Sequence, residues 1–202
     1  MVTQRRPKNV IHMKSTILRT AQIMQPQYRN RHNFMIFGGY LLKQTFELAF
    51  CCAASFSRSR PTFLSLDPST FNNPVPVGSV LYLKATVAYT DPSFTAQSSS
   101  STESSESSQS SREDQDGGRN FTKVQIRVDS GVKDVEHGRK KPTGVFNYTF
   151  LVEKDIQVMP QTYGEFMFWV DARRRAQNTN ASLASFIREL DSYKGLHDGI
   201  TG

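Results

Sequence analysis

The stretch RNRHNFMIFGGYLLKQTFELAF, residues 29–50, decides the fold of this 202-residue chain. From Gly38 to Ala54 the sequence is almost wholly apolar, and only a few polar side chains interrupt it. These interruptions make the run too polar to cross a membrane, which takes about 20 apolar residues in succession. We therefore predict a buried core helix that begins at the Gly38-Gly39 pair and ends near Ala54. Two glycines at a helix start allow another chain or a ligand to approach the backbone closely.

After this helix, apolar and polar residues alternate, which is the pattern of strands with one wet face. The alternating segments are 63–71, 80–89, 121–132 and 144–152. Turn signals around Asn73 and Gly78 separate the first two segments. One long apolar helix followed by four long strands predicts an α+β fold. In this fold, which is the hotdog architecture, an antiparallel sheet wraps around one long central helix.

The pattern also predicts the limits of the domain. We expect residues 1–14 to be unstructured and a single domain to cover residues 15–175. Residues 98–118 are rich in serine and acidic side chains and contain no apolar residue, so we expect a disordered insertion there. Residues 176–202 are expected to form a tail with a short helix from Ala181 to Tyr193.

The composition narrows the chemistry. A formal net charge of +7 favours anionic partners, which include nucleic acid, a membrane surface or a phosphorylated cofactor. No basic run is long enough to choose among them. Cys51 and Cys52 are adjacent, and neither they nor the four histidines have a zinc-like spacing. We therefore expect no metal site.

The central stretch resembles the helix-start segment of hotdog acyl-coenzyme A thioesterases. More closely, it is similar to the second hotdog repeat of the acyl-coenzyme A thioesterase 9-like group, which are mitochondrial enzymes with two repeats. Further blocks in the same order match SRPTFLSLD, FNNPVPVGSVLYL, FNYTFLVEK and MPQTYGEFMFWVDARR, which begin at Ser59, Phe71, Phe146 and Met159. The resemblance covers roughly residues 13–175 without the serine-rich insertion. It implies hydrolysis of an acyl-CoA to free fatty acid and CoA, without an added cofactor.

The resemblance also implies catalytic roles for residues at the helix start. The backbone N–H groups of Gly38 and Gly39 would polarise the thioester carbonyl, because a helix N-terminus carries unpaired donors and partial positive charge. Plain packing of the helix against the sheet is the alternative explanation for these glycines. Asn33 would orient the attacking water, and Asn30 competes for that role because the loop is longer than in some relatives. Asn33 is equally well explained as a helix-capping or turn residue.

The base that accepts a proton from water is harder to assign. Glu47 is the acidic residue of the central helix, and it lies eight positions after Gly39. Many hotdog thioesterases have the acid seven positions after the second glycine, where this chain has Phe46. One residue corresponds to about 100° of helix rotation, so Glu47 is either the base or a partner of Lys43. Paired with an acid, His32 would suggest a hotdog dehydratase, but the surrounding IFGG motif argues against that reading.

Arg58 and Arg60 follow the helix and could reach the phosphates of CoA, or they belong to an ordinary surface loop. Hotdog active sites form between two domains, so the expected partners are the acyl-CoA substrate and a second hotdog domain or a second copy. The resemblance implies no nucleic acid partner and a mitochondrial location. The first 31 residues are basic and free of acids, which suits either a transit peptide or a linker.

Overall fold

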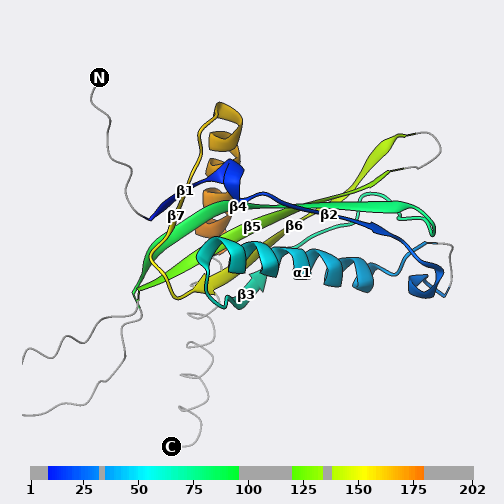
Figure 1. Cartoon of the computed structure of the whole chain (residues 1–202), viewed down its shortest axis with the longest axis horizontal. Coiled ribbons are helices and arrows are strands. Elements are labelled where there is room, and N and C mark those ends of the chain that lie inside the picture. Colours follow the sequence, from blue (N-terminus) through cyan, green and yellow to red (C-terminus); the bar gives the residue numbers. More distant parts are fainter. Residues whose placement is uncertain (1–8, 32–34, 96–119, 134–137, 180–202) are drawn as a thin grey trace, which may run out of the picture. The chain divides into compact units, whose positions relative to one another are not determined.

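The computed structural model describes residues 9–31, 35–95, 120–133 and 138–179. The chain forms two compact units, which comprise residues 1–159 and 160–202. Figure 1 shows the first unit as one long helix, α1, lying along one face of a sheet. In the second unit residues 163–179 are helical.

The main sheet of the first unit has five strands in the order β2-β4-β5-β6-β3. All neighbouring strands in it are antiparallel. Their bounds are Leu18–Ile23 for β2, Val80–Thr95 for β4, Asn120–Lys133 for β5, Lys140–Val152 for β6 and Thr62–Leu66 for β3. A separate parallel pair consists of β1 (Val10–His12) and β7 (Gln157–Met159). The short 3-10 helices η1 and η2 cover Met13–Thr16 and Pro26–Tyr28.

Helix α1 extends from Gly38 to Ser57. Its buried residues recur at helical spacing along one side: Leu41, Thr45, Ala49, Cys52, Ala53, Phe56 and Ser57. The helix ends where Arg58 adopts a left-handed conformation (φ 54°), and Pro61 follows shortly after. The long apolar run of the sequence therefore forms the predicted core helix, three residues longer than expected.

The face of the sheet that packs on α1 is identified by Tyr148 on β6, whose hydroxyl lies 2.7 Å from the Thr45 hydroxyl. Register pairs Tyr148 with Ile126 on β5, and Ile126 with Val87 on β4. These residues are at most 1% exposed, as are Val124, Val128, Phe146 and Phe150. Alternation then places Tyr82 and Lys84 on the outer face, away from α1.

Several expectations need correction. Residues 10–14, expected to lack structure, belong to β1 and to the start of η1, because Val10, Ile11 and Met13 have a strand partner and a core to contact. The first alternating segment forms a strand only up to Leu66. Pro68 follows, and Phe71 then makes only an isolated bridge to Gly144.

The C-terminal boundary also differs from the expected domain of 15–175. The first compact unit ends at Met159, and the helical residues 163–179 run across the expected boundary. The expected insertion at 98–118 and the expected short helix at 181–193 lie outside the described residues.

Candidate functional site

The start of α1 presents two backbone donors that no described residue occupies. Phe37 precedes the helix in an extended conformation, and its side chain makes no capping hydrogen bond. Its carbonyl accepts the N–H groups of Tyr40 and Leu41, at 3.0 and 3.3 Å. The N–H groups of Gly38 and Gly39 have no acceptor among the described residues. Together with the positive end of the helix dipole, they form a site for a partially negative oxygen.

Both glycines are accessible rather than sealed in the core. Gly38 is half-buried and Gly39 is exposed. A Cβ added to Gly38 would lie 3.4 Å from the ring of Phe71. The ring of Phe37 occupies the position that a Cβ of Gly39 would take, and Phe37 is itself 56% exposed. Glycine at both positions therefore leaves the backbone open to a ligand.

A hollow of about 420 Å³ lies beside this helix start. It is lined by Gln27, Tyr28, Arg29, Asn30, Arg31, Phe37 and Tyr40. The rings of Tyr28 and Tyr40 are stacked, with centroids 3.8 Å apart. Partial burial raises the pKa of the Tyr40 hydroxyl, and the neighbouring Tyr28 raises it further. The hollow is lined by aromatic rings and by the guanidinium groups of Arg29 and Arg31. Such a lining suits a ligand that has both an apolar part and an anionic group.

Of the two asparagines that compete for the water-positioning role, the structure brings Asn30 to the hollow. Its backbone N–H donates to the carbonyl of Met35 at 2.7 Å, which closes the loop just before the helix. Asn33 and His32 lie outside the described residues. The assignment of Asn33 therefore stays a prediction.

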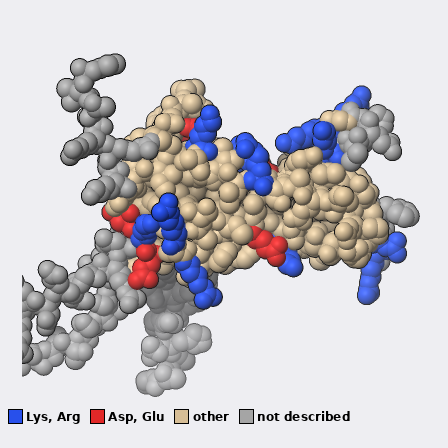
Figure 2. All heavy atoms as spheres, viewed as in Figure 1, with Lys and Arg blue, Asp and Glu red and all other residues tan. Residues whose placement is uncertain are grey.

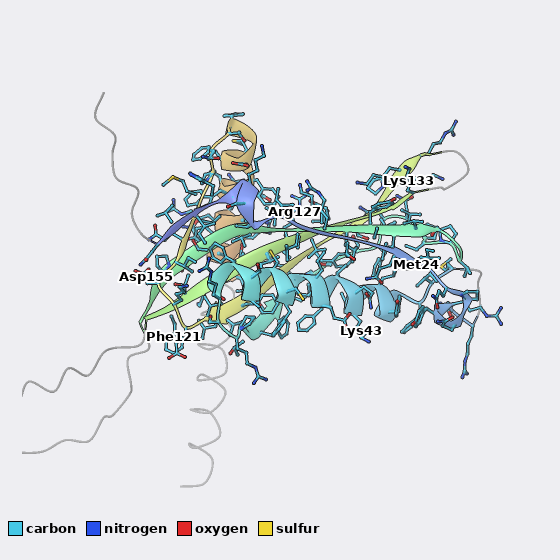
Figure 3. All side chains as sticks on the ribbon, viewed as in Figure 1. Met24, Lys43, Phe121, Arg127, Lys133 and Asp155 are labelled. Carbon is cyan, nitrogen blue, oxygen red and sulfur yellow. The ribbon has the colours of Figure 1, made fainter. Side chains whose placement is uncertain are left out.

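Glu47 lies on the exposed face of α1. Its carboxylate is 3.6 Å from the ammonium of Lys43 and accepts a hydrogen bond from Gln44 at 3.2 Å. Gln44 in turn accepts a 2.6 Å hydrogen bond from Gln22 on β2. Lys43, labelled in Figure 3, marks this face of the helix. Eight residues separate Glu47 from Gly39, about 12 Å along the helix axis, so the two cannot act on one carbonyl within the same domain.

Phe46 occupies the position where relatives were expected to have the acid. Its ring packs against those of Phe63, Tyr148 and Phe150, at centroid distances of 5.4, 5.8 and 6.0 Å. Phe50 completes the cluster at 6.4 Å. Charging a carboxylate among these rings would be costly, so in this domain the Phe46 position serves packing.

Arg58 and Arg60 are exposed in the loop after α1. The N–H of Arg58 donates to the Ala54 carbonyl at 2.8 Å and closes the helix end. Nearby, the ammonium of Lys154 binds the Ser57 carbonyl at 3.0 Å. A helix of 20 residues is about 30 Å long. The two arginines therefore lie at the opposite end of α1 from the glycine pair.

The residues that sequence reasoning missed are the aromatic ones. Tyr28, Tyr40 and Phe71 come from three separate segments, so no local spacing could have joined them. Within the described residues no group of three or more His, Cys, Asp or Glu side chains could hold a metal ion. The same described part contains no helix long and apolar enough to span a membrane.

No family model matches the chain. The chain is 33% identical over 169 residues to the human mitochondrial acyl-coenzyme A thioesterase 9 and 32% identical to the mouse mitochondrial thioesterase 10. In both cases the match covers 83% of this chain but 32% of the relative, so the chain spans about a third of their length.

Solved structures confirm the predicted hotdog fold. An acyl-CoA hydrolase from Staphylococcus aureus, solved with butyryl-CoA and CoA, has a TM-score of 0.68 at 18% identity and covers 90% of this chain and 97% of its own. The acyl-CoA hydrolase from Bacillus cereus gives 0.67 at 17% identity, covering 90% and 96%. A hexameric acyl-CoA thioesterase gives 0.65 at 21% identity, covering 87% and 98%. At these identities the likeness concerns the fold alone.

Proposed function

We propose that this chain, a homologue of the mitochondrial acyl-coenzyme A thioesterases 9 and 10 with a hotdog fold, hydrolyses acyl-CoA to a free fatty acid and CoA. The observation that carries the proposal is the accessible pair of unoccupied N–H groups at Gly38 and Gly39. A thioesterase needs donors where negative charge develops on the carbonyl oxygen. The start of α1 supplies them without any rearrangement.

In the proposed reaction the thioester oxygen accepts the two N–H groups, which makes the carbonyl carbon electrophilic. Water attacks this carbon, the C–S bond breaks, and the CoA thiolate leaves and takes up a proton. Asn30 or Asn33 would orient the water, because an amide can hold water but cannot accept its proton. The reaction also needs a carboxylate as general base.

That carboxylate must come from a second domain. Within this domain Glu47 is about 12 Å along the helix from Gly39, and Phe46 fills the other candidate position. Arg58 and Arg60, at the far end of α1, are likewise too distant to bind a CoA whose thioester lies at Gly38. A second hotdog domain with its helix antiparallel to α1 would bring its distal arginines close to this helix start, and that domain would also have to carry the carboxylate, because Glu47 of a second copy lies near the middle of its 20-residue helix.

The surface of the domain fits such a partner. Strand β3 is the last strand of the main sheet, and its Phe63 and Leu64 are 46% and 44% exposed. Phe71 and Val145, joined through the Phe71–Gly144 bridge, are also exposed. An unpaired strand edge bordered by apolar side chains is a typical docking surface. We propose that a second hotdog domain or a second copy covers it, and that the protein is mitochondrial like its named relatives.

Release of free thiol from a panel of acyl-CoAs tests the proposal. The assay uses the purified full chain alone and the chain combined with the other hotdog repeat of a relative. We expect thiol release in at least the combined sample, with no dependence on added metal. Absence of thiol release in both samples, for every acyl-CoA, would refute the enzyme proposal.

A second candidate function is a hotdog module that binds acyl-CoA without hydrolysing it. The packing of Phe46 where relatives were expected to have the acid favours this candidate. It predicts saturable acyl-CoA binding in calorimetry and an intact thioester after incubation, even when the second domain is present.

A further inference from the structure

The outer face of the main sheet carries a second hollow of about 420 Å³ that the proposed hydrolysis does not use. It is lined by Arg19, Thr20, Tyr82, Leu83, Lys84, Asp129, Ser130, Gly131, Lys140 and Pro142. We call it the outer-face hollow. Leu83 is buried on the face of the sheet that packs on α1. The next residue, Lys84, therefore points to the opposite face, away from α1. Because the sheet separates this hollow from α1, one ligand cannot occupy it and the glycine pair of the same domain together.

Three basic side chains from three strands surround the outer-face hollow. Arg19 of β2 is the register partner of Lys84 of β4, so two positive charges stand directly opposite each other. Lys140 of β6 reaches over Gly131, where its Cε would lie 3.2 Å from an added Cβ. Figure 2 shows basic side chains gathered over the end of β5 and β6, the region in which Figure 3 labels Lys133.

The acidic side chain of the hollow, Asp129, forms its ion pair with a residue other than these three bases. Asp129 is in register with Lys84, but its carboxylate instead binds the Arg127 guanidinium at 2.8 Å. Among the described residues, Arg19, Lys84 and Lys140 form no ion pair. Like charges directly opposite each other destabilise a sheet. An anionic ligand between the bases would relieve this repulsion.

Gly131, Pro142 and Tyr82 line the hollow next to the bases. The register of β5 and β6 shifts between Ser130 and Gly131, and Gly131 faces Pro142 across the strands. Gly131 is buried, and the side chain of Lys140 and the carbonyl of Lys141 lie over the place where a Cβ would stand. The half-buried ring of Tyr82, register partner of Gly131 on β4, forms the adjacent wall. An aromatic wall next to several cations suits a nucleobase joined to phosphate.

We propose that the outer-face hollow is a second ligand site that binds a phosphorylated nucleotide, separate from the helix start. Arg19, Lys84 and Lys140 bind the phosphates, and Tyr82 contacts the base. Its volume lies within the range of small-molecule sites, about 300–1,000 Å³. Two sources share this chemistry: the adenosine bisphosphate part of CoA and a free adenine nucleotide. The proposal does not depend on turnover and holds for either candidate function.

Isothermal titration of the full chain with ADP, adenosine 3′,5′-bisphosphate and inorganic pyrophosphate tests the site. We expect one saturable site for a nucleotide, with affinity that falls as salt is raised. Tighter binding of the bisphosphate would identify CoA as the source, and tighter binding of ADP a free nucleotide. Binding of pyrophosphate as tight as that of both nucleotides would overturn the nucleotide assignment, and absence of any saturable binding would overturn the site.

The variants Arg19→Gln and Lys84→Gln locate the site. Each removes a charge-assisted contact, so we expect nucleotide affinity to fall by about tenfold or more. The matched control is Lys14→Gln, an exposed lysine of η1 outside the hollow, which should keep the affinity of the unmodified chain. Equal affinities in all three variants would refute the assignment.

A ligand-free measurement guards against misfolding of the variants. Because Lys84→Gln relieves the repulsion by Arg19, the melting temperature of the free variant should be equal to or higher than that of the unmodified chain. A lower melting temperature would contradict the argument from opposed charges.

Discussion

Replacing Gly38 by proline would remove one of the two free N–H groups at the start of α1 while keeping the helix. Proline is favoured at the first helical position, which Gly38 occupies. The residue before it, Phe37, already has φ −65° and ψ 129°, an extended conformation that proline requires of its predecessor. The new side chain would contact the Phe71 ring at about the ordinary van der Waals distance, since the Cβ position lies 3.4 Å from it.

The expected loss is large because the N–H is a donor to a developing negative charge. Removal of one such donor costs about 3 kcal/mol of barrier, which lowers kcat by roughly 100- to 1,000-fold. The melting temperature should hold or rise, because proline restricts the unfolded chain. Activity would be followed by thiol release in the preparation that turns over, and folding by circular dichroism.

Gly38→Ala is the matched control, since it adds a Cβ at the same place but keeps the N–H. We expect this variant to retain activity within about threefold, well short of the loss caused by removing a donor. A Gly38→Pro enzyme that folds and turns over within a few-fold of the unmodified enzyme would show that the Gly38 N–H does not contact the carbonyl. Equal losses in both variants would point to crowding against Phe71 instead.

Three further predictions concern stability and reactivity. Burial raises the pKa of the Cys52 thiol from 9.0 to about 12. As pH rises, the thiol therefore loses its proton in the unfolded chain at a lower pH than in the folded chain, and the unfolding free energy should fall between pH 9 and about 12. A Cys52→Ala variant should flatten that fall in urea titrations, while exposed Cys51 alone should react with iodoacetamide in the folded protein. Thr45→Val should cost about 1 kcal/mol of unfolding free energy, because the Tyr148 hydroxyl loses its 2.7 Å partner and keeps only the 3.3 Å hydrogen bond to the Leu42 carbonyl; an unchanged urea midpoint would contradict this. Arg58→Gly should raise the unfolding free energy by about 1 kcal/mol, since glycine adopts the left-handed conformation at φ 54° without steric cost, and a lower melting temperature would show that the side chain stabilises the loop.

The helix and the three long central strands could be predicted because their patterns are regular over many residues. The end of β4 could not, since the register shifts between Val87 and Tyr89 and the alternation is lost there. Strand β2 escaped prediction for a different reason. Its half-buried side includes Thr20 and Gln22, so its pattern carries little hydrophobic contrast.

The candidate site was predictable only where it is local in sequence. The two glycines and the start of the helix follow from one motif, and in the structure Gly38 is half-buried and Gly39 is exposed. The stacking of Tyr28 on Tyr40 depends on how the preceding loop folds back. The facing of Arg19 and Lys84 depends on strand register, which a single sequence does not reveal.

The length of α1 has a genetic consequence. If two copies pair with antiparallel helices, each catalytic centre draws the glycine pair from one copy and the distal arginines from the other. A mixture of a Gly38→Pro chain with an Arg60→Ala chain would then contain pairs in which one centre carries both lesions and the other carries none. The two impaired alleles would then complement each other in the same cell, because each mixed pair keeps one intact centre of the two that an unmodified pair has.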